Sequence, residues 1–190
     1  MDYELACDQA EEIDATLDGQ ERLDAYRQHA DALEPGEVGR SVFLEYLADH
    51  LTMSKRYDEA RSVYVELIAD GGDCELDPRV GLLDVELRIG HTDQADALLK
   101  ELLASARADE LDLADYADIG GALEEAGEFR KAHRWFTMPL RDLDPEELEF
   151  SEVPLLHGRA RVRRALGLPV DAYDEVSQAI TGTFAAGDDA

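Results

Sequence analysis

The sequence predicts an all-α fold, an α-solenoid in which about five antiparallel helix pairs stack on one another. Three observations support this prediction. A short turn-like phrase ending in alanine recurs along the chain, apolar residues at helical spacing lie on both sides of it, and no stretch shows sustained strand-like alternation. One helix pair cannot bury its apolar stripe alone, so such pairs are stable only when neighbouring pairs stack against them.

The recurring alanines are separated by 35, 35, 37 and 40 residues and are Ala25, Ala60, Ala95, Ala132 and Ala172. A glycine stands five residues before three of them, at Gly90, Gly127 and Gly167. We therefore expect one repeat domain over residues 1–186. Its helix–turn–helix units would cover about residues 1–35, 36–72, 73–108, 109–147 and 148–186, with a frayed acidic tail at 187–190.

The elements follow in order along the chain. The acidic segment from about Asp2 to Leu17 is expected to form a first helix that caps the array. The central units carry apolar stripes before and after each turn, as helix pairs require. Pro139 should end the helix that contains Trp135 and Phe136, because proline cannot continue a helix. Pro169 should open the last helix, where its missing N–H costs little.

Small residues are expected where the two helices of a unit approach each other closely. The predicted pairs are Ala48 with Ala60, Gly120 with Ala132, and Ala160 with Ala172.

Composition limits the partners. The formal net charge is -27, from 45 acidic residues against 18 basic ones. Such a charge argues against binding nucleic acid or an anionic membrane through a broad basic surface, and it permits a basic partner. The start of the sequence has no basic or apolar region typical of a secretory signal, and Cys7 and Cys74 are far apart. We expect a cytoplasmic, bacterial protein without a disulfide framework.

The repeat spacing, the small residue late in the first helix, the turn glycine and the following alanine together resemble the tetratricopeptide repeat, abbreviated TPR. The best-matching unit runs from Leu113 to about Leu140, and the resemblance spans most of the chain. It implies a TPR-like right-handed superhelix. It also implies a protein–protein interaction module, such as an adaptor, scaffold or regulator, that binds a peptide or protein in a concave groove and needs no cofactor.

In a TPR-like arrangement the first helix of each unit lines that groove. The candidate partner-binding residues are Glu45, Asp49, Asp84, Glu124, His157, Arg161 and Arg164. The groove would be acidic in its middle and basic at its C-terminal end, which favours a basic or mixed-charge protein ligand. The alternative is that so acidic a chain carries carboxylates on every exposed surface. TPR proteins that bind chaperone tails use lysine, arginine and asparagine, and this chain has no asparagine, so that role is disfavoured.

The densest basic cluster comprises Arg159, Arg161, Arg163 and Arg164. Two explanations are open. The arginines pair with nearby acids in a terminal capping unit, or they contact an anion or phosphate, to which the arginine fork is suited.

Three other functions are weighed. The last helix presents Tyr173, Val176 and Ile180, so self-association as a homodimer is one alternative. An enzyme or small-ligand sensor is another, but no HExxH pair, catalytic triad or glycine-rich phosphate loop supports it, and we expect no catalytic or metal site. In the third, the chain mimics an acidic polymer and competes for basic partners.

Overall fold

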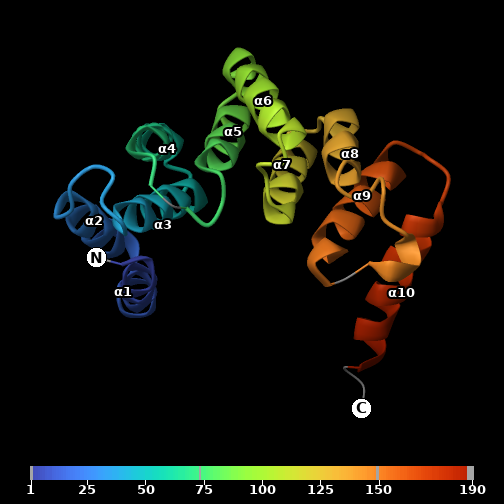
Figure 1. The fold of residues 1–190 in the computed structure, drawn as a ribbon, viewed down its shortest axis with the longest axis horizontal. Helices are drawn as coiled ribbons and strands as arrows, with labels where there is room; N and C mark the ends of the chain where they lie inside the picture. Colours follow the sequence, from blue (N-terminus) through green and yellow to red (C-terminus); the bar gives the residue numbers. More distant parts are fainter. Residues whose placement is uncertain (1, 73, 149, 188–190) are drawn as a thin grey trace. The chain divides into compact units, whose positions relative to one another are not determined.

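The structure is a computed structural model that describes residues 2–72, 74–148 and 150–187. Ten α-helices and two short 3-10 segments form its regular structure, and these described ranges contain no β-strand (Figure 1). The predicted all-α class is therefore confirmed. The helices alternate with short turns along the chain and form antiparallel pairs of the kind that the repeat requires.

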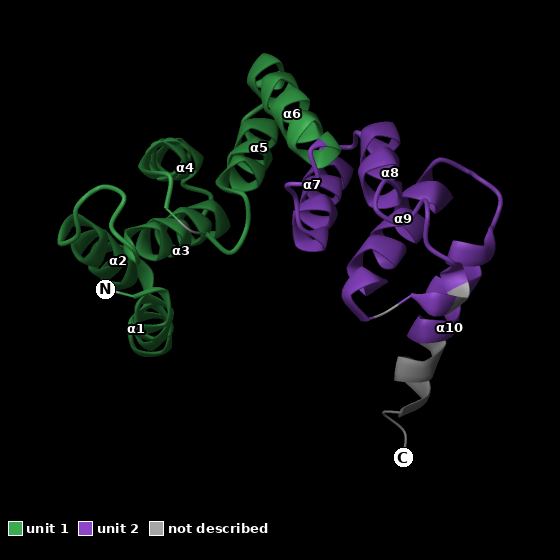
Figure 2. Ribbon diagram, viewed as in Figure 1, with its two compact units in different colours: residues 1–107 green, residues 108–190 purple. Residues whose placement is uncertain are grey.

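The chain divides into two compact units, unit 1 over residues 1–107 and unit 2 over residues 108–190 (Figure 2). Unit 1 contains the helices α1 (Tyr3–Thr16), α2 (Gly19–Asp31), α3 (Arg40–Met53), α4 (Tyr57–Asp70), α5 (Pro78–Arg88) and α6 (Thr92–Arg107). Unit 2 contains α7 (Leu113–Glu125), α8 (Phe129–Thr137), the 3-10 segments Pro145–Glu147 and Phe150–Glu152, α9 (Val153–Ala165) and α10 (Ala172–Gly187).

Helix contacts within each unit follow the pattern of stacked pairs. Each helix from α2 to α5 packs against the next one in the chain, and the first helices of successive pairs also touch, α1 against α3 and α3 against α5. In unit 2, α7, α8 and α9 pack against one another and α10 packs against α9. Because first helices touch first helices, their side chains share one face of each unit.

The helix boundaries follow from local chemistry. The Asp2 carboxylate accepts a hydrogen bond of 2.9 Å from the Leu5 amide at the start of α1. Pro78 occupies the first turn of α5 behind the capping residue Asp77. The turns inside the later pairs use left-handed glycines, with φ near 78° at Gly90 and 77° at Gly127. The α3–α4 turn places Lys55 at φ 60° in the same role.

The alanines predicted at close helix approaches are buried in the central pairs. Ala48, Ala60 and Ala132 have no exposed surface. The expected pairing of Ala160 with Ala172 is wrong, because Ala172 is exposed and is the first residue of α10.

The turn before α10 is longer than predicted, so Pro169 lies in the turn and not at the start of the helix. Polar contacts between α9 and the turn explain its length. Arg163 donates a hydrogen bond of 2.5 Å to the Pro169 carbonyl, and within residues 172–181 of α10 the buried side chains are those of Asp174 and Ser177.

Phe136 is the aromatic centre of unit 2. A methyl group added at Gly120 or Gly158 would come within 2.5 or 2.3 Å of its ring, so only glycine fits beside the ring on both α7 and α9. Helix α8, which contains Phe136, ends at Thr137, and this confirms that Pro139 truncates it. Trp135, 4% exposed, packs on Tyr116 with ring centroids 5.8 Å apart. Trp135 and Phe136 therefore both belong to the core.

Candidate functional site

The seven residues predicted to line a binding groove fall into both units. Glu45, Asp49 and Asp84 belong to α3 and α5 of unit 1, and the other four belong to α7 and α9 of unit 2: Glu124, His157, Arg161 and Arg164. The structure brings members of each set together within their own unit. That all seven line a single groove stays a prediction.

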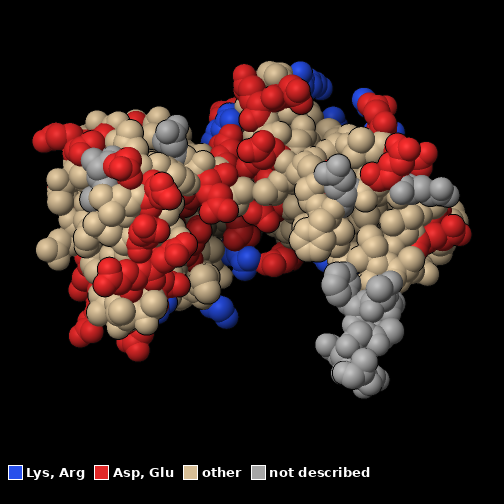
Figure 3. Space-filling view, turned by 60° about the horizontal axis from the view of Figure 1, so that its bottom comes forward, with Lys and Arg blue, Asp and Glu red and all other residues tan. Residues whose placement is uncertain are grey.

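In unit 1, carboxylates from neighbouring elements interact across one surface. Glu11 lies on α1, Glu45 and Asp49 on α3, Glu75 in the loop before α5, and Asp84 on α5. We call these five residues the acidic face. Electrostatic repulsion links its members: Asp49 and Glu75 act on Glu45, and Glu75 and Asp84 act on Asp49. In the space-filling view acidic side chains gather over unit 1, with few basic ones among them (Figure 3).

Glu45 is the most perturbed carboxylate of this face. It is half-buried, and its two oxygens accept hydrogen bonds from the backbone amides of Glu75 (3.2 Å) and Leu76 (3.3 Å). Burial, assisted by the negative charges of Asp49 and Glu75, raises the pKa of Glu45 to about 7. Glu45 therefore holds the loop before α5 and changes its charge near neutral pH.

Asp49 accepts a hydrogen bond from the Tyr64 hydroxyl of α4. Solvent reaches part of this residue, but protein atoms crowd the carboxylate, and this desolvation raises the pKa of Asp49. The Tyr64 ring lies so close to Gly81 of α5 that an added methyl group would come within 2.4 Å. Tyr64 thus positions Asp49 while it packs two helix pairs together.

Asp84 and Glu124 differ from Glu45 and Asp49, because each has an arginine partner. Asp84 accepts a hydrogen bond of 2.7 Å from Arg88, one turn further along α5. Glu124 is bound by Arg161 of α9 through two hydrogen bonds of 3.0 and 2.8 Å. Their charges are therefore largely neutralised within the protein, and they contribute less to an acidic surface than the sequence suggested.

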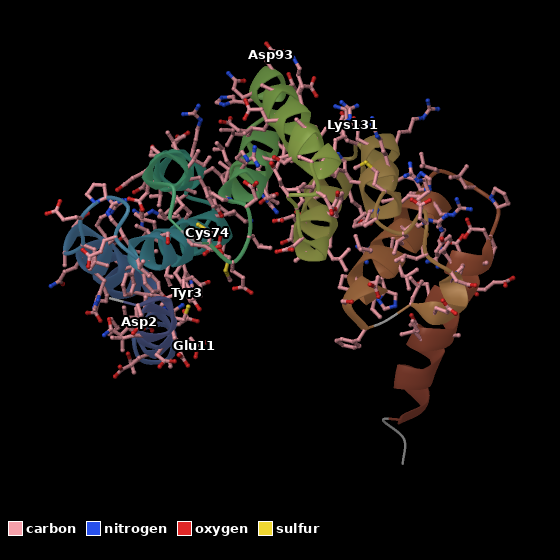
Figure 4. The ribbon with its side chains drawn as sticks, viewed as in Figure 1. Asp2, Tyr3, Glu11, Cys74, Asp93 and Lys131 are labelled. Atoms are coloured by element: carbon pink, nitrogen blue, oxygen red, sulfur yellow. The ribbon has the colours of Figure 1, made fainter. Side chains whose placement is uncertain are left out.

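Sequence reasoning missed the contribution of α1. Tyr3, Cys7 and Glu11 repeat every four residues and form a stripe beside the buried residues of that helix. Tyr3 shares a hydrogen bond with Cys7, and burial is the main cause that raises the pKa of Tyr3 to about 12. Figure 4 shows Tyr3 and Glu11 on α1. The four-residue spacing was the available signal, but helix orientation was needed to show which residues it meets.

Tyr46 of α3 supplies a second aromatic side chain near this surface. Glu11 of α1 and Glu75 of the loop before α5 both act electrostatically on it, and its pKa is raised, chiefly by burial. The acidic face therefore combines carboxylates with two partly buried tyrosines, Tyr3 and Tyr46.

The arginine cluster of unit 2 divides into two pairs with different roles. Arg159 and Arg163 are 5% and 9% exposed, and they bind Asp171 and Asp174 at the start of α10. The hydrogen bonds from Arg159 hold the pKa of Asp171 at about 2. His133 of α8 lies near this network, and burial together with the two arginine charges lowers its pKa. Pairing with local acids thus explains these two arginines.

Arg161 and Arg164 are not part of the network with Asp171 and Asp174 and instead line a surface groove. With His157 and Ala160 of α9 and three residues of α10, they line this groove of about 470 Å³; the α10 residues are Ser177, Gln178 and Thr181. The structure therefore brings together the three predicted residues His157, Arg161 and Arg164.

Tyr173, which was considered for self-association, is engaged inside unit 2. Its hydroxyl lies within hydrogen-bond distance of the carbonyl oxygens of Leu140 (2.7 Å) and Leu143 (2.8 Å), and the Arg159 guanidinium lies 4.8 Å from its ring centre. Val176 and Ile180 are partly buried. A homodimer through this stripe stays a prediction.

Two structural features that other functions would require are absent from the described residues. Over these ranges no group of three or more histidine, cysteine or acidic side chains is placed to hold a metal ion. In the same part of the chain no helix combines the length and apolar character needed to cross a membrane.

The geometry defines an all-α repeat scaffold. No family model and no curated protein matches the sequence. The structure is similar to the crystal structure of a Podospora anserina protein described as a kinesin light chain with nearly identical TPR-like repeats. The TM-score is 0.63 at 18% identity, over 96% of this chain and 94% of that one. A second crystal structure of that protein, with one residue substituted, gives 0.61 at 17% identity, over 99% and 95% of the two chains.

The chain therefore has the TPR-like repeat fold that its repeat spacing resembled.

Proposed function

We propose that the protein is an interaction scaffold whose acidic face binds a basic or mixed-charge segment of a protein partner. The observation that carries the proposal is the environment of the Glu45 carboxylate. Its carboxylate is desolvated beside Asp49 and Glu75, and no cation among the described residues is paired with it. A lysine or arginine from a partner would supply the missing opposite charge.

The surroundings of Glu45 fit such a segment. Glu11 and Glu75 are exposed, so they can meet a partner without any change in the fold. Tyr3 and Tyr46 offer aromatic rings against which arginine or lysine side chains pack favourably. Charges steer and orient the partner, and buried aromatic contacts supply the specific affinity.

Binding of a basic partner should release protons near neutral pH. Glu45, with a pKa of about 7, is partly protonated there, and a neighbouring cation favours its charged form. Calorimetry with a peptide of alternating arginine and serine, in two buffers of different ionisation enthalpy, measures this release. The Glu45→Gln variant should bind the peptide with no such proton release.

A matched pair of variants tests the location. Glu11→Gln combined with Glu75→Gln should weaken binding about tenfold at low salt, because each exposed ionic contact contributes ~0.5–1 kcal/mol. Glu21→Gln combined with Glu101→Gln removes the same charge from the exposed surface of α2 and α6 and should leave binding unchanged. Equal weakening in both double variants would show that net charge alone attracts the peptide.

Salt distinguishes this proposal from the polymer-mimic alternative. Binding by diffuse charge should vanish at about 0.3 M salt, where the Debye length is well below ~10 Å. Binding that also uses Tyr3 and Tyr46 should persist there at reduced affinity.

A further inference from the structure

The groove between α9 and α10 is distinguished by the charge of its lining. In a chain with 45 acidic residues among 190, none of the seven described residues that line it is acidic. Two are arginines, one is a histidine, and two carry hydroxyl groups: Arg161, Arg164, His157, Ser177 and Thr181. By comparison, two surface grooves of unit 1 are lined by Asp24 together with other carboxylates. The α9–α10 groove is thus a local exception to the acidity of the protein.

Arg161 is held in place by Glu124 and keeps hydrogen-bond donors that this contact does not use. Its Nε and Nη2 atoms bind the two oxygens of Glu124 at 3.0 and 2.8 Å, while its side chain remains 57% exposed. This two-point pair fixes the plane of the guanidinium and leaves the Nη1 hydrogens available. Glu124 therefore acts as a positioning residue for Arg161.

Arg164 lies one turn further along α9 and is exposed, and its side chain makes no ion pair or hydrogen bond within residues 2–72, 74–148 and 150–187. Arg107, Arg130 and Arg134 are likewise without a carboxylate partner among the described residues, but they do not line this groove, whereas Arg164 does. Arg159 and Arg163 of the same helix are both paired with Asp171 and Asp174. Pairing within the capping unit thus explains two of the four arginines and does not explain Arg164.

The opposite wall of the groove is polar. The Thr181 hydroxyl donates a hydrogen bond of 2.9 Å to the Ser177 carbonyl and lies 3.3 Å from His157 Nε2. Ser177 is buried and also lines the groove. Polar groups from α9 and α10 therefore surround one space, which suits a group with several acceptor oxygens better than a single acceptor.

We propose that the α9–α10 groove binds a phosphate group carried by a ligand, with Arg164 as its main charged contact, Arg161 donating from Nη1, and the Ser177 hydroxyl as a further contact. A phosphate presents three oxygens to arginine forks and hydroxyl donors, whereas a carboxylate presents two. The site is independent of the acidic face, since it lies in unit 2 and takes the opposite charge.

The test is a nuclear magnetic resonance titration of the full chain with inorganic phosphate, acetate and chloride at equal ionic strength. Phosphate should cause saturable shifts at Arg161, Arg164, Ser177 and Thr181, and the other two anions should not. Arg164→Gln, which breaks no contact in the described structure, should weaken phosphate binding about tenfold, as expected for loss of one charged hydrogen-bonding group.

The control is Arg130→Gln combined with Arg134→Gln, two exposed arginines of α8 in the same unit that lie outside the groove lining. This variant should bind phosphate as the unmodified protein does. Equal weakening by Arg164→Gln and by the control, or shifts that chloride reproduces, would overturn the proposal. If acetate binds saturably and as tightly as phosphate, the groove is a general carboxylate-binding site and the phosphate proposal is overturned. None of these results bears on the binding of a basic peptide to unit 1.

Discussion

The guanidinium of Arg159 binds the Asp171 carboxylate through two hydrogen bonds of 3.0 and 2.7 Å and joins α9 to the start of α10. Arg163 and Asp174 extend this network at the same helix junction. The α7–α8 pair, by contrast, meets through buried alanine and aromatic side chains. The α9–α10 pair is joined through buried charges. Its stability should therefore depend on mutation and pH in a different way from that of the α7–α8 pair.

Replacement of Arg159 by alanine should lower the free energy of unfolding by about 3 kcal/mol, because it leaves Asp174 buried beside a single remaining arginine. Chemical denaturation followed by fluorescence measures this change. The single tryptophan, Trp135, is buried in unit 2 and reports on the relevant unit. Arg161→Ala breaks an ion pair that is more exposed and should cost under about 1 kcal/mol. A similar small loss for Arg159→Ala would contradict a stabilising role for the network.

Acid should weaken unit 2 through Asp171. Its folded-state pKa of about 2 lies below the usual value of ~3.9, so its contribution to stability is present above about pH 4 and is lost as the pH falls through 2. In the Asp171→Asn variant, unfolding followed by Trp135 fluorescence should show a smaller loss of stability between about pH 4 and pH 2 than in the unmodified protein. The control Asp142→Asn changes a side chain that is 82% exposed and should retain the acid dependence of the unmodified protein.

Gly158→Ala should destabilise unit 2 by about 1–3 kcal/mol, since the added methyl group would come within 2.3 Å of the Phe136 ring. Gly121→Ala provides the matched control. It lies in α7 with open space around it, so the same substitution should stabilise the helix by up to about 1 kcal/mol. If both variants gain stability when measured by denaturation, Phe136 does not require a glycine at residue 158.

The charge on Glu45 should make unit 1 less stable as the pH rises. Its folded-state pKa of about 7 exceeds the usual value of ~4.3, so the stability that the protonated form contributes is complete below about pH 4 and is lost as the pH rises through 7. Thermal unfolding at pH 5 and pH 8, followed by circular dichroism, should therefore show a smaller difference for Glu45→Gln than for the unmodified protein. Glu11→Gln, at an exposed position, should leave the difference intact; an unchanged difference in Glu45→Gln would refute the assignment.

Much of the fold could be predicted because its determinants are local. The interval between alanines, the turn glycines and Pro139 act within one or two helical turns of their own positions. The first helix, expected from about Asp2 to Leu17, runs from Tyr3 to Thr16 for the same reason. The prediction failed at Pro169 and Ala172, where Arg159 and Arg163 reach residues of the next turn and set the start of α10.

The candidate site was only partly predictable. Glu45 and Asp49 were found because the first helices of a repeat fold share a face. The roles of Tyr3 and Glu11 depend on how α1 meets α3, which no spacing within α1 can specify. The four clustered arginines look equivalent in the sequence, yet two of them are buried against acids of α10 and two line a groove.

The sequence by itself determined the all-α class, the repeat and the acidity of this protein, because periodicity and composition are properties of the chain. Only the tertiary structure decided which charges are neutralised and which remain available. A carboxylate or guanidinium is paired or unpaired according to its neighbours from other helices, as the contrast between Arg159, paired with Asp171, and Arg164 shows.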